Sequence, residues 1–213
     1  MLDMINKHVA KIALVLKDGD SILSVSKRTG SSYGWTHRWI KSLEEIGAVE
    51  REGGTGIRIK DEELIDGVRG LARSFLRRKL QLKDAYLLPN FSRMKYAFTK
   101  TDAVFFWTKG GYQIGRSRES YPIFIKVLED DLDDWKSFFE EYSVDCEVGG
   151  KGGSGIHYVL FPCEDFETEW LDNASVTPLE ETVKWAMEHK PNFQPALEML
   201  DEMYDLGLGV EYS

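Results

Sequence analysis

Cysteine and histidine are scarce in this chain, which has two of the first and four of the second among 213 residues. Cys146 and Cys163 alone cannot form a disulfide framework, a zinc ribbon or an iron–sulfur site, so we interpret both as reduced core residues. The four histidines are scattered, and none has a second ligand at metal-binding spacing. The sequence therefore predicts neither a metal site nor a cofactor.

Long apolar runs are also missing. No stretch approaches the roughly 20 apolar residues that a membrane-spanning helix needs, and the N-terminus carries acidic residues without a small-residue cleavage site. Hydrophobic residues make up 42% of the chain, which is enough for a core, and its length predicts one or two domains. We expect a folded, cytoplasmic protein with no membrane partner.

Recognisable catalytic motifs are absent as well. No serine stands in a Gly-x-Ser-x-Gly motif, and neither cysteine stands in a nucleophile motif. The aspartates between residues 130 and 134 cluster at a predicted helix start, where the free amides of the first turn account for them. We expect no catalytic residues and no enzymatic activity.

Charge is unevenly distributed along the sequence, whose net charge is −9. Residues 1–80 contain 15 Lys and Arg against 11 Asp and Glu, a net charge of +4, and the rest contain 12 against 25, a net charge of −13. A basic segment attracts phosphate, whereas an acidic one repels it. We therefore expect the two halves of the chain to have different partners.

Residues 31–59 have the most informative pattern. Thr36, Ile40 and Leu43 recur at helical spacing and predict one narrow face packed on a core. Gly47 is suited to end that helix, because glycine adopts the left-handed conformation of a C-terminal cap. Two short strands joined by a glycine-rich turn then follow, as in a β-hairpin.

The opposite face of this helix carries hydroxyl, aromatic and basic side chains without a carboxylate. Such a face suits the DNA major groove, where Arg binds guanine and hydroxyls reach phosphates or bases. The alternative interpretation is that the tryptophans are core residues and the cations form an ordinary solvated surface. We assign Trp39 to the core, and Tyr33, Trp35 and Arg38 to the groove-facing side.

Two shorter helices are predicted before this one. Residues 5–16 carry an apolar stripe that begins at Ile5, and residues 22–29 would pack over the following helix after a turn at Gly30 and Ser31. The segment SVSKRTGSSYGWTHRWIKSLEEIGAVEREGG resembles MarR-like and related archaeal winged-helix regulators, and LEEIGAVER is its most specific part. The resemblance implies a winged helix-turn-helix fold that binds double-stranded DNA. We also expect a homodimer, because a single winged domain buries a modest area and a dimer that reads two half-sites has higher affinity and specificity. The predicted DNA-binding residues are Lys27, Arg28, Ser31, Ser32, Tyr33, Trp35, His37, Arg38, Lys41, Arg51 and Arg58.

Residues 61–82 predict an amphipathic linker helix that begins at Asp61. We expect its apolar face to pack on its own domain, although it also suits a dimer seam. That face consists of the stripe Leu64, Val68, Leu71 and Phe75, with Ile65, Ala72 and Leu76 beside it. Three arginines, Arg69, Arg73 and Arg77, stand four apart on its polar face. That face suits either a DNA backbone or the acidic half of the chain.

The remaining residues, 83–213, predict an acidic domain in which a mixed sheet carries a helical hairpin, so the whole chain is α+β. Strands are expected at residues 121–128, 144–148 and 156–161, with Pro162 ending the last one, and a helix at 130–142. Residues 96–107 suit either a strand or a helix. If a helix forms, Thr101 or Asp102 would cap it. A capping box at Thr177 begins the first helix of the hairpin, and the second covers residues 192–206.

The glycine-rich loop from Gly149 to Gly155 also has two interpretations. Its amides and Lys151 suit an anion, but a phosphate-binding loop opens a helix, whereas a strand follows here. We expect a hairpin loop between two strands.

Two resemblances concern the rear domain. Residues 96–127 are similar to the opening of the nucleotidyltransferase-like domains of AbiE-type abortive-infection systems. Arg116 and Ser117 match the Arg-Ser/Thr pair of that family. Lys100 and Thr101 replace glycines, and residues 121–123 replace the metal-binding carboxylates. The segment VTPLEETVKWAMEHKPNFQPALEML resembles the C-terminal helices of AbiEi-type antitoxins. These resemblances imply a non-catalytic domain and a toxin as possible protein partner.

The sequence thus predicts three parts: a DNA-binding domain at residues 1–60, the linker helix at 61–82 and the rear domain at 83–213. The expected function is that of a transcriptional regulator, for example an antitoxin-type autorepressor. The alternatives are a nucleotidyltransferase-like enzyme acting on nucleic acid and a winged-helix module that binds only protein.

Overall fold

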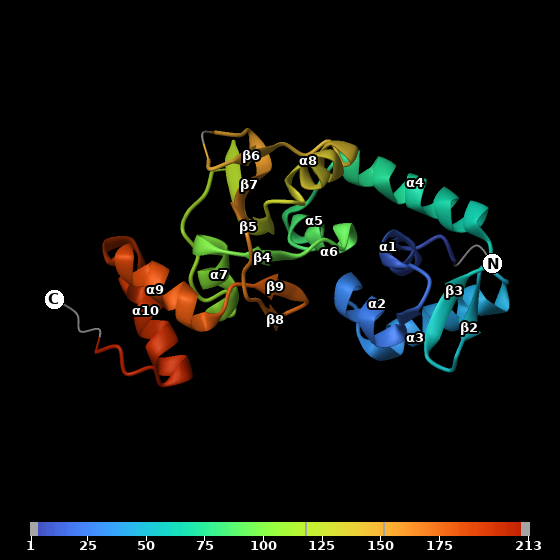
Figure 1. Cartoon of the computed structure of the whole chain (residues 1–213), viewed down its shortest axis with the longest axis horizontal. Helices are drawn as coiled ribbons and strands as arrows, with labels where there is room; N and C mark the ends of the chain where they lie inside the picture. The colour runs from blue at the N-terminus through green and yellow to red at the C-terminus, as the bar shows by residue number, and fades with distance from the viewer. Residues whose placement is uncertain (1–3, 118, 151, 210–213) are drawn as a thin grey trace. The chain divides into compact units, whose positions relative to one another are not determined.

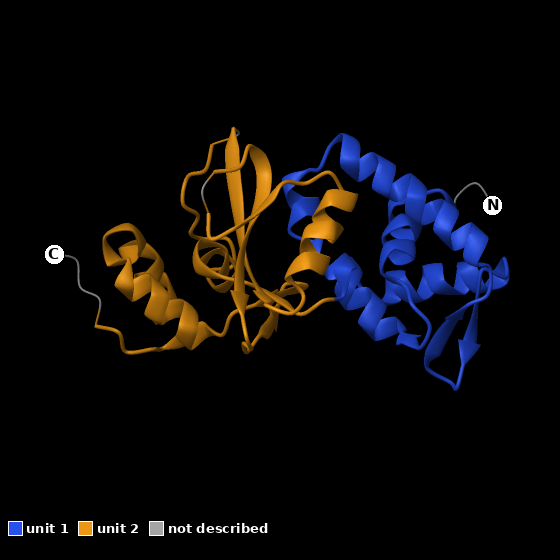
Figure 2. Ribbon diagram, turned by 45° about the horizontal axis from the view of Figure 1, so that its top comes forward, with its two compact units in different colours: residues 1–93 blue, residues 94–213 orange. Residues whose placement is uncertain are grey.

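The computed structural model describes residues 4–117, 119–150 and 152–209 (Figure 1). The chain divides into two compact units, residues 1–93 and residues 94–213 (Figure 2). Each unit combines helices with a sheet of its own, of three strands in the first and six in the second, which confirms the α+β class. In the part of the chain described, no helix combines the length and apolarity needed to cross a bilayer.

The first unit contains a short three-stranded sheet among helices. Its elements are α1 (Lys7–Val15), β1 (Asp20–Ser21), α2 (Ile22–Thr29), α3 (Tyr33–Glu45), β2 (Val49–Glu52), β3 (Gly56–Ile59), α4 (Glu62–Arg78), α5 (Leu82–Ala85) and α6 (Pro89–Ser92). The two helices and the hairpin predicted between residues 22 and 59 are all present.

Local capping residues fix where α2 and α3 begin and end. Ser21 forms a capping box with Ser24 at the start of α2, and Gly30 ends that helix with a φ of 64°. The Ser32 hydroxyl accepts a hydrogen bond from the Trp35 amide at the start of α3. Gly47 follows α3 with a φ of 78°, a conformation in which glycine lacks the steric penalty of other residues. The predicted end of α3 is thereby confirmed.

The three-stranded sheet has the order β1-β3-β2, with antiparallel pairing throughout. The strand β1 was not predicted, because its two residues are too few to show a periodic pattern. The Asp18 carboxylate accepts a hydrogen bond of 2.7 Å from the Ile59 amide and holds the end of β3 to the loop before β1. This sheet and α1, α2 and α3 enclose a core that includes Ile12, Val25, Ile40 and Ile57.

The helix predicted at residues 61–82 is present as α4, which ends at Arg78, and Asp61 accepts a hydrogen bond from the Leu64 amide at its start. Its buried face was predicted only in part. Leu64, Leu71 and Phe75 are 40%, 49% and 65% exposed, whereas Ile65 and Ala72 are buried. The reason lies in Arg69, which was expected on the polar face.

Arg69 fixes the rotation of α4 against α1. Its guanidinium donates hydrogen bonds of 2.7 Å to the Ala13 carbonyl and 2.6 Å to the Leu16 carbonyl, at the C-terminal end of α1. Carbonyls at a helix end lack partners within the helix, and a cation there is favourable. The face that includes Arg69 therefore packs inward, and the predicted apolar stripe is turned outward. Ile5, predicted to belong to the α1 stripe, is also exposed and precedes the helix.

The second unit contains a six-stranded sheet with the order β6-β7-β5-β4-β9-β8. Its elements are β4 (Tyr96–Phe98), α7 (Lys100–Trp107), β5 (Ser120–Leu128), α8 (Leu132–Glu141), β6 (Cys146–Val148), β7 (Gly155–Cys163), β8 (Glu169–Leu171), β9 (Ala174–Val176), α9 (Leu179–Glu188) and α10 (Lys190–Tyr204). Residues 96–107, left open above, form a strand followed by a helix.

Several predictions for this unit were wrong in detail. β6 and β7 are parallel neighbours and not a hairpin. Pro162 lies inside β7, which continues to Cys163. The short strands β8 and β9 were missed. The cap of α7 is Thr99 and not Thr101 or Asp102. The N-cap of α9 is Pro178 and not Thr177, and no side-chain capping bond forms there.

Asp102 is fully buried in this unit and joins three segments of the chain. Its carboxylate accepts 2.8 Å hydrogen bonds from the Phe124 amide in β5 and from the Arg116 guanidinium. The Arg116 side chain is itself only 7% exposed. Each charge offsets the desolvation cost of the other, so removing one leaves the other buried without its counter-charge.

We expect Asp102→Ala to destabilise the second unit by about 3–5 kcal/mol, because Arg116 loses its buried counter-charge. Urea unfolding followed by near-ultraviolet circular dichroism measures this. The control is Asp133→Ala, since Asp133 pairs with Lys136 on an exposed helix face and such pairs contribute about 0–1 kcal/mol. Equal effects of the two substitutions would contradict the role given to Asp102.

Candidate nucleic-acid interface

One face of α3 is fixed by burial, and this determines which side chains the opposite face presents. Thr36, Ile40 and Leu43 are buried toward α1 and α2, as predicted. The Thr36 hydroxyl also bonds back to the Ser32 carbonyl at 3.1 Å, which satisfies it inside the core. The exposed side of α3 carries Tyr33, Gly34, Trp35, His37, Arg38 and Lys41.

Aromatic stacking holds the tryptophans of α3 in place. The Trp35 ring, 47% exposed, stacks on the His8 ring of α1 with centroids 5.3 Å apart and nearly parallel planes. The Arg38 guanidinium lies over the Trp35 ring at 5.3 Å and over Trp39 at 5.9 Å. Trp39, predicted as core, is half-buried and also stacks on His8. Arg38 is thus positioned by the rings beneath it and remains exposed.

Gly34 is the residue of α3 least explained by the fold. A Cβ atom placed on it would meet nothing within 4 Å, and glycine in a helix is less favourable than alanine by up to about 1 kcal/mol. No packing contact in the described structure requires glycine at this position. What the missing side chain does provide is a close approach to the helix backbone for an outside partner.

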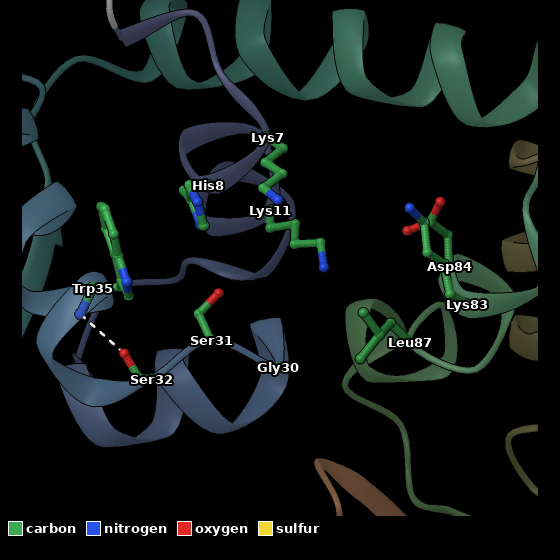
Figure 3. Close-up of a pocket in the computed structure, with 10 residues that line it drawn as sticks. All are labelled: Lys7, His8, Lys11, Gly30, Ser31, Ser32, Trp35, Lys83, Asp84 and Leu87. Atoms are coloured by element: carbon green, nitrogen blue, oxygen red, sulfur yellow. Dashed lines mark hydrogen bonds between the residues drawn. The ribbon is translucent and has the colours of Figure 1, made fainter.

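A cationic pocket lies at the N-terminal end of α3, entirely within the first unit (Figure 3). Its volume is about 520 Å³. Lys7 and Lys11 from α1 and Lys83 from α5 contribute three amines, and Asp84 contributes one carboxylate. The rest of the lining is His8, Gly30, Ser31, Ser32, Trp35 and Leu87.

Burial is the main cause of the lowered pKa values in the pocket. It lowers the pKa of Lys11, Asp84 opposes this shift, and Lys7 and Lys83 add smaller lowering effects. Burial, Lys7 and Lys11 likewise lower the pKa of His8. A group of amines that repel one another is stabilised by an anion between them, and the N-terminus of α3 adds a favourable dipole. The pocket is therefore suited to a phosphate.

The two cations of α2 that were predicted to bind DNA have different surroundings in the structure. Lys27 is exposed, as a phosphate contact requires. The Arg28 guanidinium instead forms a 2.5 Å ion pair with Asp20, which also lies 3.4 Å from Arg93. Burial, together with Arg28, lowers the pKa of Arg93 to about 10. Arg28 thus belongs to an internal charge cluster, in which its guanidinium faces Asp20.

The hairpin of β2 and β3 carries its cations in ion pairs. Arg58 bonds to Glu50, which raises the pKa of Arg58 and lowers that of Glu50. Arg51 lies 4.0 Å from Glu44 of α3, and Lys41 lies 3.9 Å from Glu45. Exposed pairs of this kind exchange partners at little cost, so they leave these cations accessible.

Sequence reasoning missed Lys7, His8, Gly34, Lys11 and Lys83. A weak signal existed for two of them, because Lys7 and Lys11 stand four apart and so share one side of α1. Lys83 gave none, since only the fold brings α5 to the pocket. Ser31 and Ser32 were predicted for their hydroxyls, and Ser32 uses its own to cap α3.

In the second unit, residues aligned with nucleotidyltransferase-like domains contact other parts of the fold. Arg116, which matches that pattern, pairs with Asp102, and the amine of Lys100, which replaces a glycine, lies 3.6 Å from the centroid of the Phe161 ring. Among the described residues, no group of three or more His, Cys, Asp and Glu side chains is placed to hold a metal ion. Lys151 of the glycine-rich loop lies outside the described residues.

Comparison with protein-family models, with curated proteins and with solved structures found no match to this chain. The geometry and charge of α3 and the cationic pocket therefore carry the functional argument.

We expect the pKa of His8 to lie below about 6.5, its ordinary value, and Lys7→Met to raise it, because that variant removes a repelling cation. Since the folded pKa is the lower one, the contribution of His8 to stability is complete above pH 6.5 and declines as the pH falls through the folded pKa. Nuclear magnetic resonance titration of the His8 ring measures both effects. Lys41→Met is the control, and an unchanged His8 pKa in Lys7→Met would contradict the assignment.

Proposed function

We propose that the first unit is a winged helix-turn-helix domain that binds double-stranded DNA with α3 in the major groove, and that the protein is a transcriptional regulator. The observation that carries this proposal is the exposed side of α3. Over residues 33–43 it carries cations, aromatics and an unhindered glycine without a carboxylate.

Specificity is assigned to the middle of α3. Arg38 is exposed and rests on tryptophan rings, which limits its conformations before binding and favours a bidentate contact with guanine. Tyr33 and His37 lie beside each other on the same side, with ring centroids 6.1 Å apart. Gly34 lets the first turn of α3 approach the base edges or the backbone closely.

Affinity is assigned to phosphate contacts around this helix. The cationic pocket accepts one backbone phosphate between Lys7, Lys11 and Lys83, and Lys27 and Lys41 reach others. The hairpin of β2 and β3 is the wing, where Arg51 and Arg58 exchange their glutamate partners for phosphate. Such contacts orient the domain without reading sequence.

The second unit is assigned a different partner. Its segment of the sequence is strongly acidic, and acidic surfaces repel the DNA backbone. We propose that it binds a protein. The resemblance of residues 176–200 to antitoxin helices favours a toxin, in which case the protein would be an autorepressor.

The proposal is tested by fluorescence anisotropy with a duplex from the region upstream of the gene and a shuffled duplex, over a series of salt concentrations. We expect tighter binding to the native duplex and a negative slope of log affinity against log salt, because phosphate binding releases counterions. Lys11→Met should make that slope shallower by about 1. Lys184→Met, on an exposed position of α9 in the second unit, is the matched control.

Other outcomes of this experiment would overturn specific parts. Equal affinity for both duplexes would remove the sequence-reading role of α3 and leave a non-specific nucleic-acid protein. Binding to neither duplex at low salt would make the first unit a module that contacts protein only.

Gly34→Gln separates folding from binding. We expect this variant to be at least as stable as the native protein, because glutamine favours helix and meets open space. Its affinity for the native duplex should fall by roughly tenfold or more, since the added side chain holds DNA away from α3. Thermal unfolding and anisotropy measure the two effects. Unchanged affinity would mean that α3 does not approach DNA at its first turn.

A further inference from the structure

The helix α4 has two apolar faces, and only one is used inside the first unit. Ile65 and Ala72 are buried, and α4 packs along α1. Leu64, Leu71 and Phe75 lie at spacings of seven and four, so they form a second line along the helix, and they are 40%, 49% and 65% exposed. We refer to the line of Leu64, Gly67, Leu71 and Phe75 as the α4 seam.

Two glycines beside the exposed leucines make the seam unusually accessible. Gly67 belongs to the seam and Gly70 borders it, and a Cβ atom on either would meet nothing within 4 Å. Glycine within a helix costs up to about 1 kcal/mol relative to alanine, and no contact of the described residues explains the two. Small residues between larger apolar ones allow another helix to approach closely.

Charge along α4 is segregated by sign. Glu62 and Glu63 occupy its first turn, and Arg77 and Arg78 occupy its last turn. A second α4 running antiparallel brings the acidic end of each helix to the basic end of the other. A parallel pair would instead place like charges side by side at both ends.

We propose that the α4 seam is the interface of a homodimer, in which the seams of two copies pack antiparallel about a two-fold axis. In this register Leu64 lies opposite Phe75 of the second copy, and the segment from Gly67 to Leu71 crosses the axis. Glu63, on the flank of the seam, then lies two residues from the position directly opposite Arg78 of the second copy, which the long arginine side chain can span, and the two-fold axis generates this pair twice.

The seam is self-complementary in both apolar pattern and charge, which a two-fold interface requires. The seam spans only about three helical turns, so it forms a smaller interface than a standard one of about 800 Å² per partner. The dimer should therefore dissociate on dilution, and its formation does not depend on DNA.

Sedimentation velocity of the full-length protein without DNA, over a range of concentrations, tests the proposal. We expect a monomer–dimer equilibrium. Glu63→Arg should raise the dissociation constant roughly tenfold, because two attractive pairs become repulsive. Glu63→Arg combined with Arg78→Glu should restore it. Glu62→Arg is the matched control, since it makes the same charge change in the same helical turn but on the side away from the seam.

A further variant tests the apolar contact. Phe75→Ser should raise the dissociation constant by at least roughly tenfold without loss of helicity, since Phe75 is exposed in the single chain. A protein that stays monomeric at all concentrations would overturn the proposal, as would a dimer that tolerates Phe75→Ser. A dimer weakened by Glu63→Arg but not restored by the double variant would overturn the antiparallel register.

Discussion

The rotation of α3 about its own axis is the constraint on which the candidate interface depends. It is set by three buried residues, Thr36, Ile40 and Leu43, packed toward α1 and α2. A change of rotation by one residue would turn Arg38 and His37 by about 100°. Polar side chains of α3 would then be buried without hydrogen-bond partners in the core. The same packing brings Trp35 onto His8, so the core that stabilises the unit also positions the proposed DNA-reading side chains.

This dependence explains which parts of the first unit could be predicted from the sequence. The buried face of α3 and its C-terminal end follow from local signals, namely apolar spacing and the cap residue Gly47, whereas Ser32 was predicted only as a DNA contact and not as the N-terminal cap. The cationic pocket does not follow from local signals, because Lys11 and Lys83 come from segments far apart in the sequence. Arg28 shows the converse case, since its neighbours in sequence suggested a solvent-facing cation, and Asp20 turns it inward.

In the second unit and in α4, polar contacts between distant segments determine which side chains are buried. The hydrophobic periodicity of the sequence does not predict these contacts. Aspartate is a common helix-cap residue, yet Asp102 is fully buried and accepts hydrogen bonds from Phe124 and Arg116. Arg69 has the spacing of a solvated arginine, yet it binds two carbonyls of α1. In both cases a buried polar group found a partner from a distant segment, and a hydrophobic pattern contains no information about that partner.

Because Arg69 fixes one face of α4 against α1, the other apolar face cannot turn inward without breaking those two hydrogen bonds. The helix is therefore held with Leu64, Leu71 and Phe75 exposed, and exposed apolar side chains aligned on one helix are stabilised when a partner covers them. A two-fold pair of such helices would present two copies of α3. Two weakly bound half-sites then reinforce each other, which compensates for the few phosphate contacts that one such domain makes.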